Sequence, residues 1–378
     1  ALKTEDAVRQ GAPTLMLRPK PGAGLTFNPA LFGVGDDWTL GKDTWSNATL
    51  LAAIRSTKVG LTRFPGGACS NYWNLSSADV VDDCENATCN GRSQGMWCYV
   101  KQEVAQAPAG AFSTERFLDG PAAACSDKDV VIDLNLLHFD EHTAPGLVDA
   151  VQASAGARKL TRWELGNEYY LPTDWVNATH SQPYVCNPAS TSAGYAARSL
   201  AVIDHIRKTV KRPVQVAAQA SMKELLHPEQ GTAWNEGIRA TGVADAADAI
   251  TLHDYDQRSL RQIAAPYKVN ALAALSQVHL QLIQQVAPKQ WPGKRVWMTE
   301  FGIDVGTFKS NELLYSLNHG GVKAMFVLSR VLAAVATEGL VEVLQYYSLG
   351  GQGWGKLAGI LQWDTEGKGT LEGDAVAQ

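Results

Sequence analysis

Short apolar runs alternate with longer segments of helical periodicity along this chain, from residue 31 to roughly residue 350. A parallel sheet made of repeated strand and helix units produces this pattern, because strands covered on both faces are continuously apolar. The runs predict eight strands, at residues 31–35, 60–64, 130–136, 160–165, 214–218, 249–252, 295–299 and 341–346. Eight such strands favour a (β/α)8 TIM barrel, which places its chemistry at the carboxyl ends of the strands.

The segments between these runs carry the helical patterns. Thr191 or Ser192 can cap one predicted helix, because a hydroxyl there accepts a hydrogen bond from a free helix amide. The clearest predicted helices cover residues 47–57, 144–154, 192–210, 269–286 and 311–337.

The barrel accounts for residues 31–354 and leaves two flanks, 1–30 and 355–378. The first flank contains LMLRP and GLTF, the second contains GILQW, and each of these predicts a short β segment. One long excursion, residues 66–112, follows the second strand. Its richness in Gly, Asn, Asp and Cys predicts a disulfide-pinned loop on the catalytic face.

The cysteines are even in number and confined to the first half of the chain, which suits disulfides whose pairing the sequence leaves open. Reduced core thiols are the alternative, but the cysteines of residues 69–98 fit neither a strand stripe nor a helix stripe. The six disulfide candidates are Cys69, Cys84, Cys89, Cys98, Cys125 and Cys186.

Sequons for N-linked glycans point in the same direction as the cysteines. Both features favour an oxidising secretory compartment, and so a secreted or extracellular protein. The first residues, ALKTEDAVRQ, lack the pattern of a signal peptide, which we expect to have been removed. The predicted glycan acceptors are Asn47, Asn74, Asn86 and Asn177.

Charge and composition exclude several partners. A net charge of -5 with no basic run argues against nucleic acid. The longest apolar region, residues 324–340, contains Arg330 and Glu338, so it predicts a packed helix rather than a membrane span. Gly33 and Gly35 lack the third glycine of a nucleotide-binding loop, and we expect no cofactor.

The strongest chemical signal lies at two predicted strand ends. KLTRWELGNEYY brings one strand to Asn167 and Glu168, and KRVWMTEFG brings another to Glu300. Because the carboxyl ends of barrel strands meet at one mouth, we expect the side chains at the other strand ends to join them. These are Arg63, His138, His253, Tyr255, Tyr346 and, beyond the last strand, Trp354.

This set of residues resembles the clan A glycoside hydrolases, in which an Asn-Glu pair ends barrel strand four and a second glutamate ends strand seven. LTRFPGG followed by Asn71-Tyr72-Trp73 is similar to the α-L-arabinofuranosidases. ELGNE and the His-x-Tyr turn are similar to the heparanase and β-glucuronidase family. The resemblance covers the barrel, and it implies that the two flanks form a partial β-sandwich.

The resemblance implies a retaining hydrolase acting on a carbohydrate substrate, with Glu168 as acid/base and Glu300 as nucleophile. Retention requires the two carboxyl groups to lie about 5 to 5.5 Å apart. Asn167 would bind the sugar 2-hydroxyl, and Arg63 and Tyr255 would keep Glu300 ionised. The remaining strand-end residues, His138, His253, Tyr346 and Trp354, are expected to contact substrate.

Three alternatives are weighed against this hypothesis. The run from His138 through Asp140 and Glu141 to His142 offers metal donors, but a loop does not hold histidines four apart on one face, so we predict no metal site. Glu164 is expected to point away from the mouth, into strand packing or an ion pair. The alternative function is a catalytically silent carbohydrate-binding or structural component of an extracellular assembly.

Overall fold

A computed structural model describes residues 28–35, 44–46, 48–81, 101, 104–105, 110–125, 129–156, 158, 160–171, 191–226, 233–255, 280–281, 283–302, 321–347, 362–363 and 369–370. Eight parallel strands close into a barrel in the order β1-β10-β9-β8-β7-β6-β5-β2. They are β1 (Gly33–Gly35), β2 (Thr62–Phe64), β5 (Val130–Asp133), β6 (Arg162–Leu165), β7 (Gln215–Gln219), β8 (Ala249–Tyr255), β9 (Arg295–Gly302) and β10 (Val341–Tyr347). Each coincides with a predicted run, and the predicted TIM barrel is confirmed.

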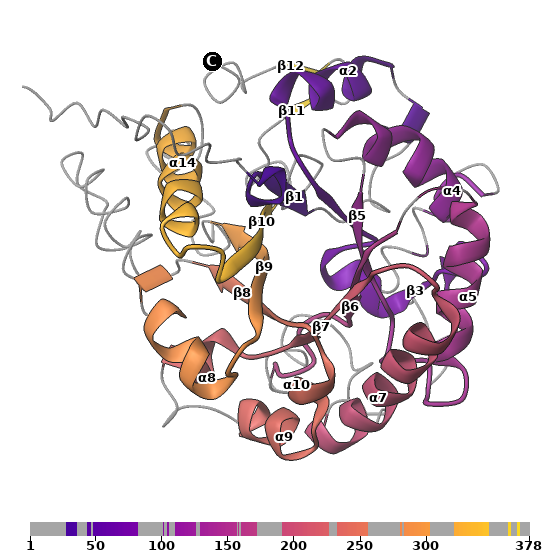
Figure 1. The fold of residues 1–378 in the computed structure, drawn as a ribbon. Helices are drawn as coiled ribbons and strands as arrows, with labels where there is room; N and C mark the ends of the chain where they lie inside the picture. Colours follow the sequence, from indigo (N-terminus) through magenta and orange to yellow (C-terminus); the bar gives the residue numbers. More distant parts are fainter. Residues whose placement is uncertain are drawn as a thin grey trace, which may run out of the picture.

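Helices surround this ring of strands, as Figure 1 shows in a view close to the barrel axis. Four predicted helices are observed as α2 (Ala48–Thr57), α5 (Ala144–Ala155), α7 (Ser192–Thr209) and α14 (Gly321–Val335). Of the predicted helix 269–286, the described residues 280–281 and 283–286 are helical. The prediction did not include α4 (Thr114–Phe117), α8 (Met222–Leu226), α9 (Trp234–Ala240), α10 (Val243–Ala246), or the turns η1 (Pro29–Leu31), η3 (Thr44–Ser46), η4 (Gly67–Tyr72) and η5 (Leu118–Ala122).

The start of α7 illustrates how the local sequence sets a boundary. Thr191 is the N-cap, one of the two caps that the sequence predicts, and its Oγ1 accepts a hydrogen bond from Gly194 N at 3.1 Å. Arg207 and Lys208 occupy the last turn, where cations interact favourably with the negative end of the helix dipole.

Two apolar clusters flank the barrel wall. The larger one fills the layer between strands and helices and includes Phe64, Phe117 and Trp163. The smaller cluster closes one end of the barrel interior and consists of Ala30, Leu61, Val131, Ala217, Ala249, Trp297 and Val343. Residues two positions further along these strands share the same face, so the next layer of the interior contains Arg63, Asp133 and Gln345. The interior therefore changes from apolar to polar toward the carboxyl ends of the strands.

The excursion after β2 is only partly described. It begins with η4 and a small antiparallel pair, β3 (Trp73–Asn74) and β4 (Asp79–Val80). Cys69 and Cys125 are buried and no disulfide joins these two, while the other four cysteines lie outside the described residues. The predicted disulfides thus remain a prediction.

The second flank contributes a β segment where GILQW predicts one. Strand β11 (Gln362–Trp363) pairs antiparallel with β12 (Gly369–Thr370). The β segments predicted in the first flank lie outside the described residues. No helix in the described part of the chain has the length and apolar character needed to cross a bilayer.

Candidate active site

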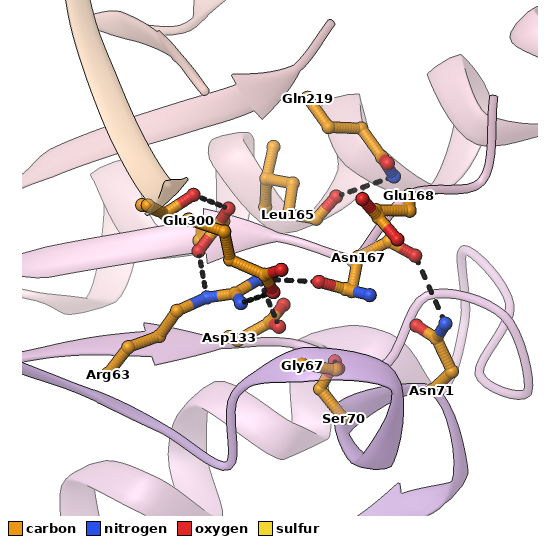
Figure 2. Close-up of polar contacts among 12 residues, drawn as sticks. Arg63, Gly67, Ser70, Asn71, Asp133, Leu165, Asn167, Glu168, Gln219 and Glu300 are labelled. Atoms are coloured by element: carbon orange, nitrogen blue, oxygen red, sulfur yellow. Dashed lines mark hydrogen bonds and ion pairs between the residues drawn. The ribbon is translucent and has the colours of Figure 1, made fainter. Parts of the chain in front are cut away.

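Arg63 lies fully buried in the barrel interior, where side chains from β5, β6, β9 and the loop after β6 accept its hydrogen bonds. Its Nε donates to Glu164 Oε2 at 2.6 Å, its Nη1 to Glu300 Oε1 at 2.6 Å, and its Nη2 to Asp133 Oδ2 at 2.8 Å and Asn167 Oδ1 at 2.9 Å. Figure 2 shows the guanidinium among Glu300, Asp133 and Asn167. Burial alone would lower the pKa of Arg63, but the surrounding carboxylates raise it well above its ordinary value.

Glu300, near the end of β9, is held through both of its oxygens. Arg63 binds Oε1, and the Tyr255 hydroxyl donates to Oε2 at 2.5 Å. Burial, followed by the charge of Glu300, raises the pKa of Tyr255 well above its ordinary value, so the phenol remains a hydrogen-bond donor. Both expected partners of Glu300 are therefore in contact with it.

Glu168 approaches Glu300 from the loop after β6. A carboxylate oxygen of Glu168, one of Glu300 and a ring nitrogen of His253 all lie within 4.8 Å of one another. The Glu168 side chain is 22% exposed and that of Glu300 only 5%. The pair consists of one fixed, buried carboxyl group and one that solvent can reach.

His253 connects Glu168 to the barrel interior. Its Nδ1 lies 2.9 Å from Glu168 Oε1 and 3.5 Å from Glu300 Oε2, and its Nε2 lies 3.1 Å from Thr299 Oγ1. Burial opposes the charged ring, but the charge of Glu300 and the contacts with Glu164 and Glu168 raise the pKa of His253 to about 10. At neutral pH the ring is an imidazolium that donates through both nitrogens.

The loop that carries Glu168 is fixed from several sides. Gly166 has φ +88, and a Cβ there would lie 2.5 Å from the Tyr169 ring, so glycine is required. Tyr169 N donates to Gln219 Oε1 at 2.8 Å, and Asn71 Nδ2 donates to the Asn167 carbonyl at 3.0 Å. Figure 2 shows Asn71 reaching this carbonyl from the excursion after β2. The excursion and the Glu168 loop are thus joined directly.

Comparison with known proteins shows which solved structures share this fold. No family model matches the sequence, and no curated protein matches it either. Solved structures do match: a family 51 α-L-arabinofuranosidase from Bifidobacterium longum has a TM-score of 0.61 at 13% identity, with 93% of this chain and 72% of that chain covered. A GH51 α-L-arabinofuranosidase from Thermotoga petrophila has a TM-score of 0.58 at 15% identity, covering 92% of this chain and 69% of that one.

A family 44 xyloglucanase from Paenibacillus polymyxa also matches, with a TM-score of 0.55 at 10% identity over 85% of this chain and 73% of that chain. These structures share the (β/α)8 barrel fold with this chain. At these identities the likeness establishes the architecture, and the chemistry has to be argued from the residues of this chain.

Two buried carboxylates of this barrel were not predicted as part of the site. Glu164 was expected in packing or an ion pair, and it does form an ion pair, with Arg63 inside the barrel. Asp133 was not singled out. The alternation of β5, with Val131 and Asp133 on one face, contains the signal, because a carboxylate at an interior position needs a buried partner.

The other predicted site residues are placed as follows. His138 is half-buried, with Nδ1 2.8 Å from the Asn71 carbonyl oxygen. Tyr346 packs edge-on against Phe301 in the layer behind the barrel, whereas its neighbour Tyr347 contacts Tyr255. The mouth-facing position of β10 is therefore Tyr347 rather than the expected Tyr346. Trp354 lies outside the described residues.

Of the predicted glycan acceptors, the structure describes Asn74, which is half-buried and whose Oδ1 accepts from Ser76 N at 2.9 Å. Asn47, Asn86 and Asn177 lie outside the described residues. Glycosylation stays a prediction.

Metal binding is weighed at two places. The ligand atoms of Glu168, His253 and Glu300 lie close enough to share an ion, but the imidazolium has no lone pair to offer while both nitrogens hold protons. In the run 138–142, Asp140 Oδ1 instead accepts from His142 N at 3.1 Å and from Thr143 N at 2.9 Å. Its role there is to close the turn before α5.

Proposed function

We propose that this chain is a retaining glycoside hydrolase that cleaves the glycosidic bonds of a polysaccharide or glycoconjugate by double displacement. The observation that carries the proposal is the approach of a Glu168 oxygen to within 4.8 Å of a Glu300 oxygen. Retaining enzymes hold their two carboxyl groups about 5 to 5.5 Å apart, whereas inverting enzymes leave space for a water between them. The spacing here favours retention.

Glu300 is the nucleophile, because Arg63 and Tyr255 fix it and counter its charge. Its oxygen attacks the anomeric carbon while Glu168 gives a proton to the leaving oxygen, which departs as an alcohol. A covalent glycosyl-enzyme results. Glu168, now a carboxylate, takes a proton from water, the water oxygen attacks the anomeric carbon, and Glu300 leaves as a carboxylate.

His253 decides which oxygen of Glu168 reacts. Its Nδ1 donates to Oε1, so we assign proton transfer to the other oxygen, Oε2. Asn167 is oriented by Arg63 through its Oδ1, so its Nδ2 is the group that would donate to a sugar hydroxyl. Tyr347 replaces Tyr346 as the proposed substrate contact of β10.

The sugar is proposed to be an arabinofuranoside or a uronide. Two of the similar structures are described as α-L-arabinofuranosidases and a third as a xyloglucanase, so neutral furanosides have the stronger structural support. A panel of aryl arabinofuranosides, glucuronides, galactosides and xylosides would rank these classes. We also propose a secreted, glycosylated protein, based on its cysteines and sequons.

The function is tested with Glu168→Ala and Glu300→Ala, using Glu236→Ala on the exposed face of α9 as control. Both site variants should fold and lose turnover by at least about 10²-fold, while the control keeps it. Azide should restore turnover in Glu300→Gly with the opposite anomeric configuration in the product. For Glu168→Ala, leaving groups that need no proton should be affected least.

A folded parent that binds glycans but turns over no member of the panel would support the alternative, a silent carbohydrate-binding component. Turnover that survives in either alanine variant would refute the assignment of the two glutamates.

A further inference from the structure

Glu164 lies below the proposed catalytic pair, fully buried in β6 and four residues before Glu168. Its carboxylate cannot touch a substrate in the cleft, because solvent does not reach it. A charge in such a place is costly unless it is paired. The contacts of this carboxylate therefore indicate what it does.

Both oxygens of Glu164 are used, and each leads to a different cation. Oε2 accepts from Arg63 Nε at 2.6 Å. Oε1 accepts from Thr299 Oγ1 at 2.8 Å and lies 3.9 Å from His253 Nε2, and Thr299 in turn lies 3.1 Å from that nitrogen. One carboxylate thus faces the guanidinium directly and the imidazolium mainly through a hydroxyl.

Each of these cations also contacts one of the proposed catalytic carboxyl groups. Arg63 Nη1 binds Glu300 Oε1 at 2.6 Å, and His253 Nδ1 binds Glu168 Oε1 at 2.9 Å. A continuous series of contacts runs from one glutamate of the pair, through the barrel interior, to the other. Glu164 is its midpoint.

We propose that Glu164 is a positioning residue: the shared buried counter-ion that holds Arg63 against the nucleophile and His253, through Thr299, against the acid/base. The mechanistic part of this proposal rests on the proposed function, whereas the electrostatic part does not.

The neighbouring carboxylate does not fill the same role. Asp133 lies opposite Glu164 in the β5–β6 register, but among the described residues only its Oδ2 has a hydrogen-bond partner and its Oδ1 has none. Burial, partly offset by Arg63 and reinforced by Glu164, raises the pKa of Asp133 to about 7. Burial opposes the Glu164 charge too, but Arg63 and His253 outweigh it and lower its pKa. Of these two buried carboxyl groups, Glu164 is therefore the one that is ionised throughout the neutral pH range.

A constant counter-ion matters because the charges above it change during double displacement. When Glu300 is esterified, Arg63 and His253 lose one negative neighbour. Glu164 keeps its charge through both steps, since it is remote from the reacting atoms. The two cations therefore stay in place while the carboxyl groups of the pair alter their charge.

The direct test is the titration of His253 by NMR, with isotope-labelled histidine, in the parent and in Glu164→Gln. This substitution keeps the size of the side chain and an acceptor for Thr299 but removes the charge. The groups that face the ring are Glu164 and Glu168 from β6 and its loop, Glu300 from β9, and Asp133 from β5. We expect the pKa of His253 to fall by about one unit or more, since an opposite charge nearby shifts a pKa by about 1 to 3 units.

Two further variants make the outcome decisive. Thr299→Val keeps every charge and removes only the relay, so the pKa of His253 should fall by less than in Glu164→Gln. Glu342→Gln is the matched control: Glu342 accepts from Trp297 Nε1 at 3.0 Å and from Gln215 toward the other end of the barrel, so its substitution should leave His253 unaffected.

An unchanged titration in Glu164→Gln, or an equal shift in Glu342→Gln, would overturn the proposal. Should Glu164→Gln fail to fold, an unchanged titration in Thr299→Val would overturn it instead.

A kinetic measurement separates this inference from the proposed function. With an accepted aryl glycoside, Glu164→Gln should lower kcat and kcat/KM by the same factor, about tenfold or more, because Glu164 acts without touching substrate. If His253 shifts but the parent turns over no glycoside, the function fails and the counter-ion role stands. If the parent is active and His253 does not shift, the counter-ion role alone fails.

Discussion

Two arginines of this barrel are fully buried, and their surroundings are opposite. Arg63 lies inside the barrel, where three carboxylates and an amide oxygen accept its hydrogen bonds. Arg330 lies outside it, on α14, where Nη1 pairs with Asp254 Oδ2 at 2.6 Å. Its guanidinium carbon lies 5.8 Å from the Phe301 ring centre and 5.5 Å from that of Phe326, and its Nε and Nη2 have no hydrogen-bond partner within the described part of the chain.

The difference shows that a buried cation can serve a site in two ways. Arg63 takes part in the electrostatics of the candidate active site, because Glu300 is one of its acceptors. Arg330 holds a strand: Asp254 lies between His253 and Tyr255, so its ion pair fixes the backbone from which both rings reach the opposite face of β8. We expect that no apolar residue can replace Arg63 without loss of stability and activity. Arg330 and Asp254, by contrast, should be replaceable together by apolar residues.

The largest effect is expected for Arg63→Met, which leaves several buried carboxylates without their cation. We expect a loss of about 3 to 5 kcal/mol in the free energy of unfolding and a fall in turnover of about 10² to 10³-fold. Urea denaturation and aryl glycoside turnover measure these losses. Unfolding free energy should partly recover toward pH 5, as carboxylates gain protons. A variant as stable and active as the parent would remove the distinction between the arginines.

A smaller loss in the free energy of unfolding, which a second substitution should restore, is expected on the outer side of the barrel. Asp254→Ala leaves Arg330 buried opposite an aromatic wall and should cost about 3 kcal/mol. The double variant Asp254→Leu with Arg330→Met should return to within about 1 kcal/mol of the parent, because its surroundings are already apolar. Thermal and urea unfolding give both values. A double variant no better than the single one would show that Arg330, like Arg63, needs its charge.

The last prediction concerns the pH dependence of stability. Because burial raises the pKa of Asp133 to about 7, the folded state binds a proton that the unfolded state releases near pH 4. Asp133 therefore makes the free energy of unfolding fall as pH rises from about 4 to 7, by at most about 1.4 kcal/mol per pH unit. In Asp133→Asn this part of the slope should disappear. Parallel urea titrations across that range test it, and an equal slope in both proteins would contradict it.

The sequence predicted the barrel because the signal is repeated: all eight strands are apolar runs, and each error in a boundary leaves the count intact. Strand-end positions, read together with the resemblance to the clan A glycoside hydrolases, predicted that Glu168 and Glu300 lie close together, and they do. The sequence did not show which of the adjacent tyrosines of β10, Tyr346 or Tyr347, faces the mouth of the barrel. The pairing of β10 with β9 shifts register between Leu344 and Tyr346, and such a shift breaks the alternation on which a facing assignment depends.

The charged residues of the barrel interior could be predicted from the sequence only in part. Arg63 was expected beside Glu300, and that contact is present. Glu164 and Asp133 are interior because strands alternate, but a strand-end rule considers only the last residues of each strand. Their shared contact with one guanidinium depends on the β5–β6 register, in which Asp133 is opposite Glu164, and no pattern within one strand specifies that register.

The backbone of Glu168 has a practical consequence. Its φ of 57 lies in the left-handed region, which costs a non-glycine residue roughly 1 kcal/mol. Glycine adopts this region without steric penalty, so Glu168→Gly should remove the local backbone strain while deleting the proposed proton donor. Such a variant should melt at least as high as the parent and retain bound oligosaccharide, which makes it the natural starting material for trapping a Michaelis complex in a crystal.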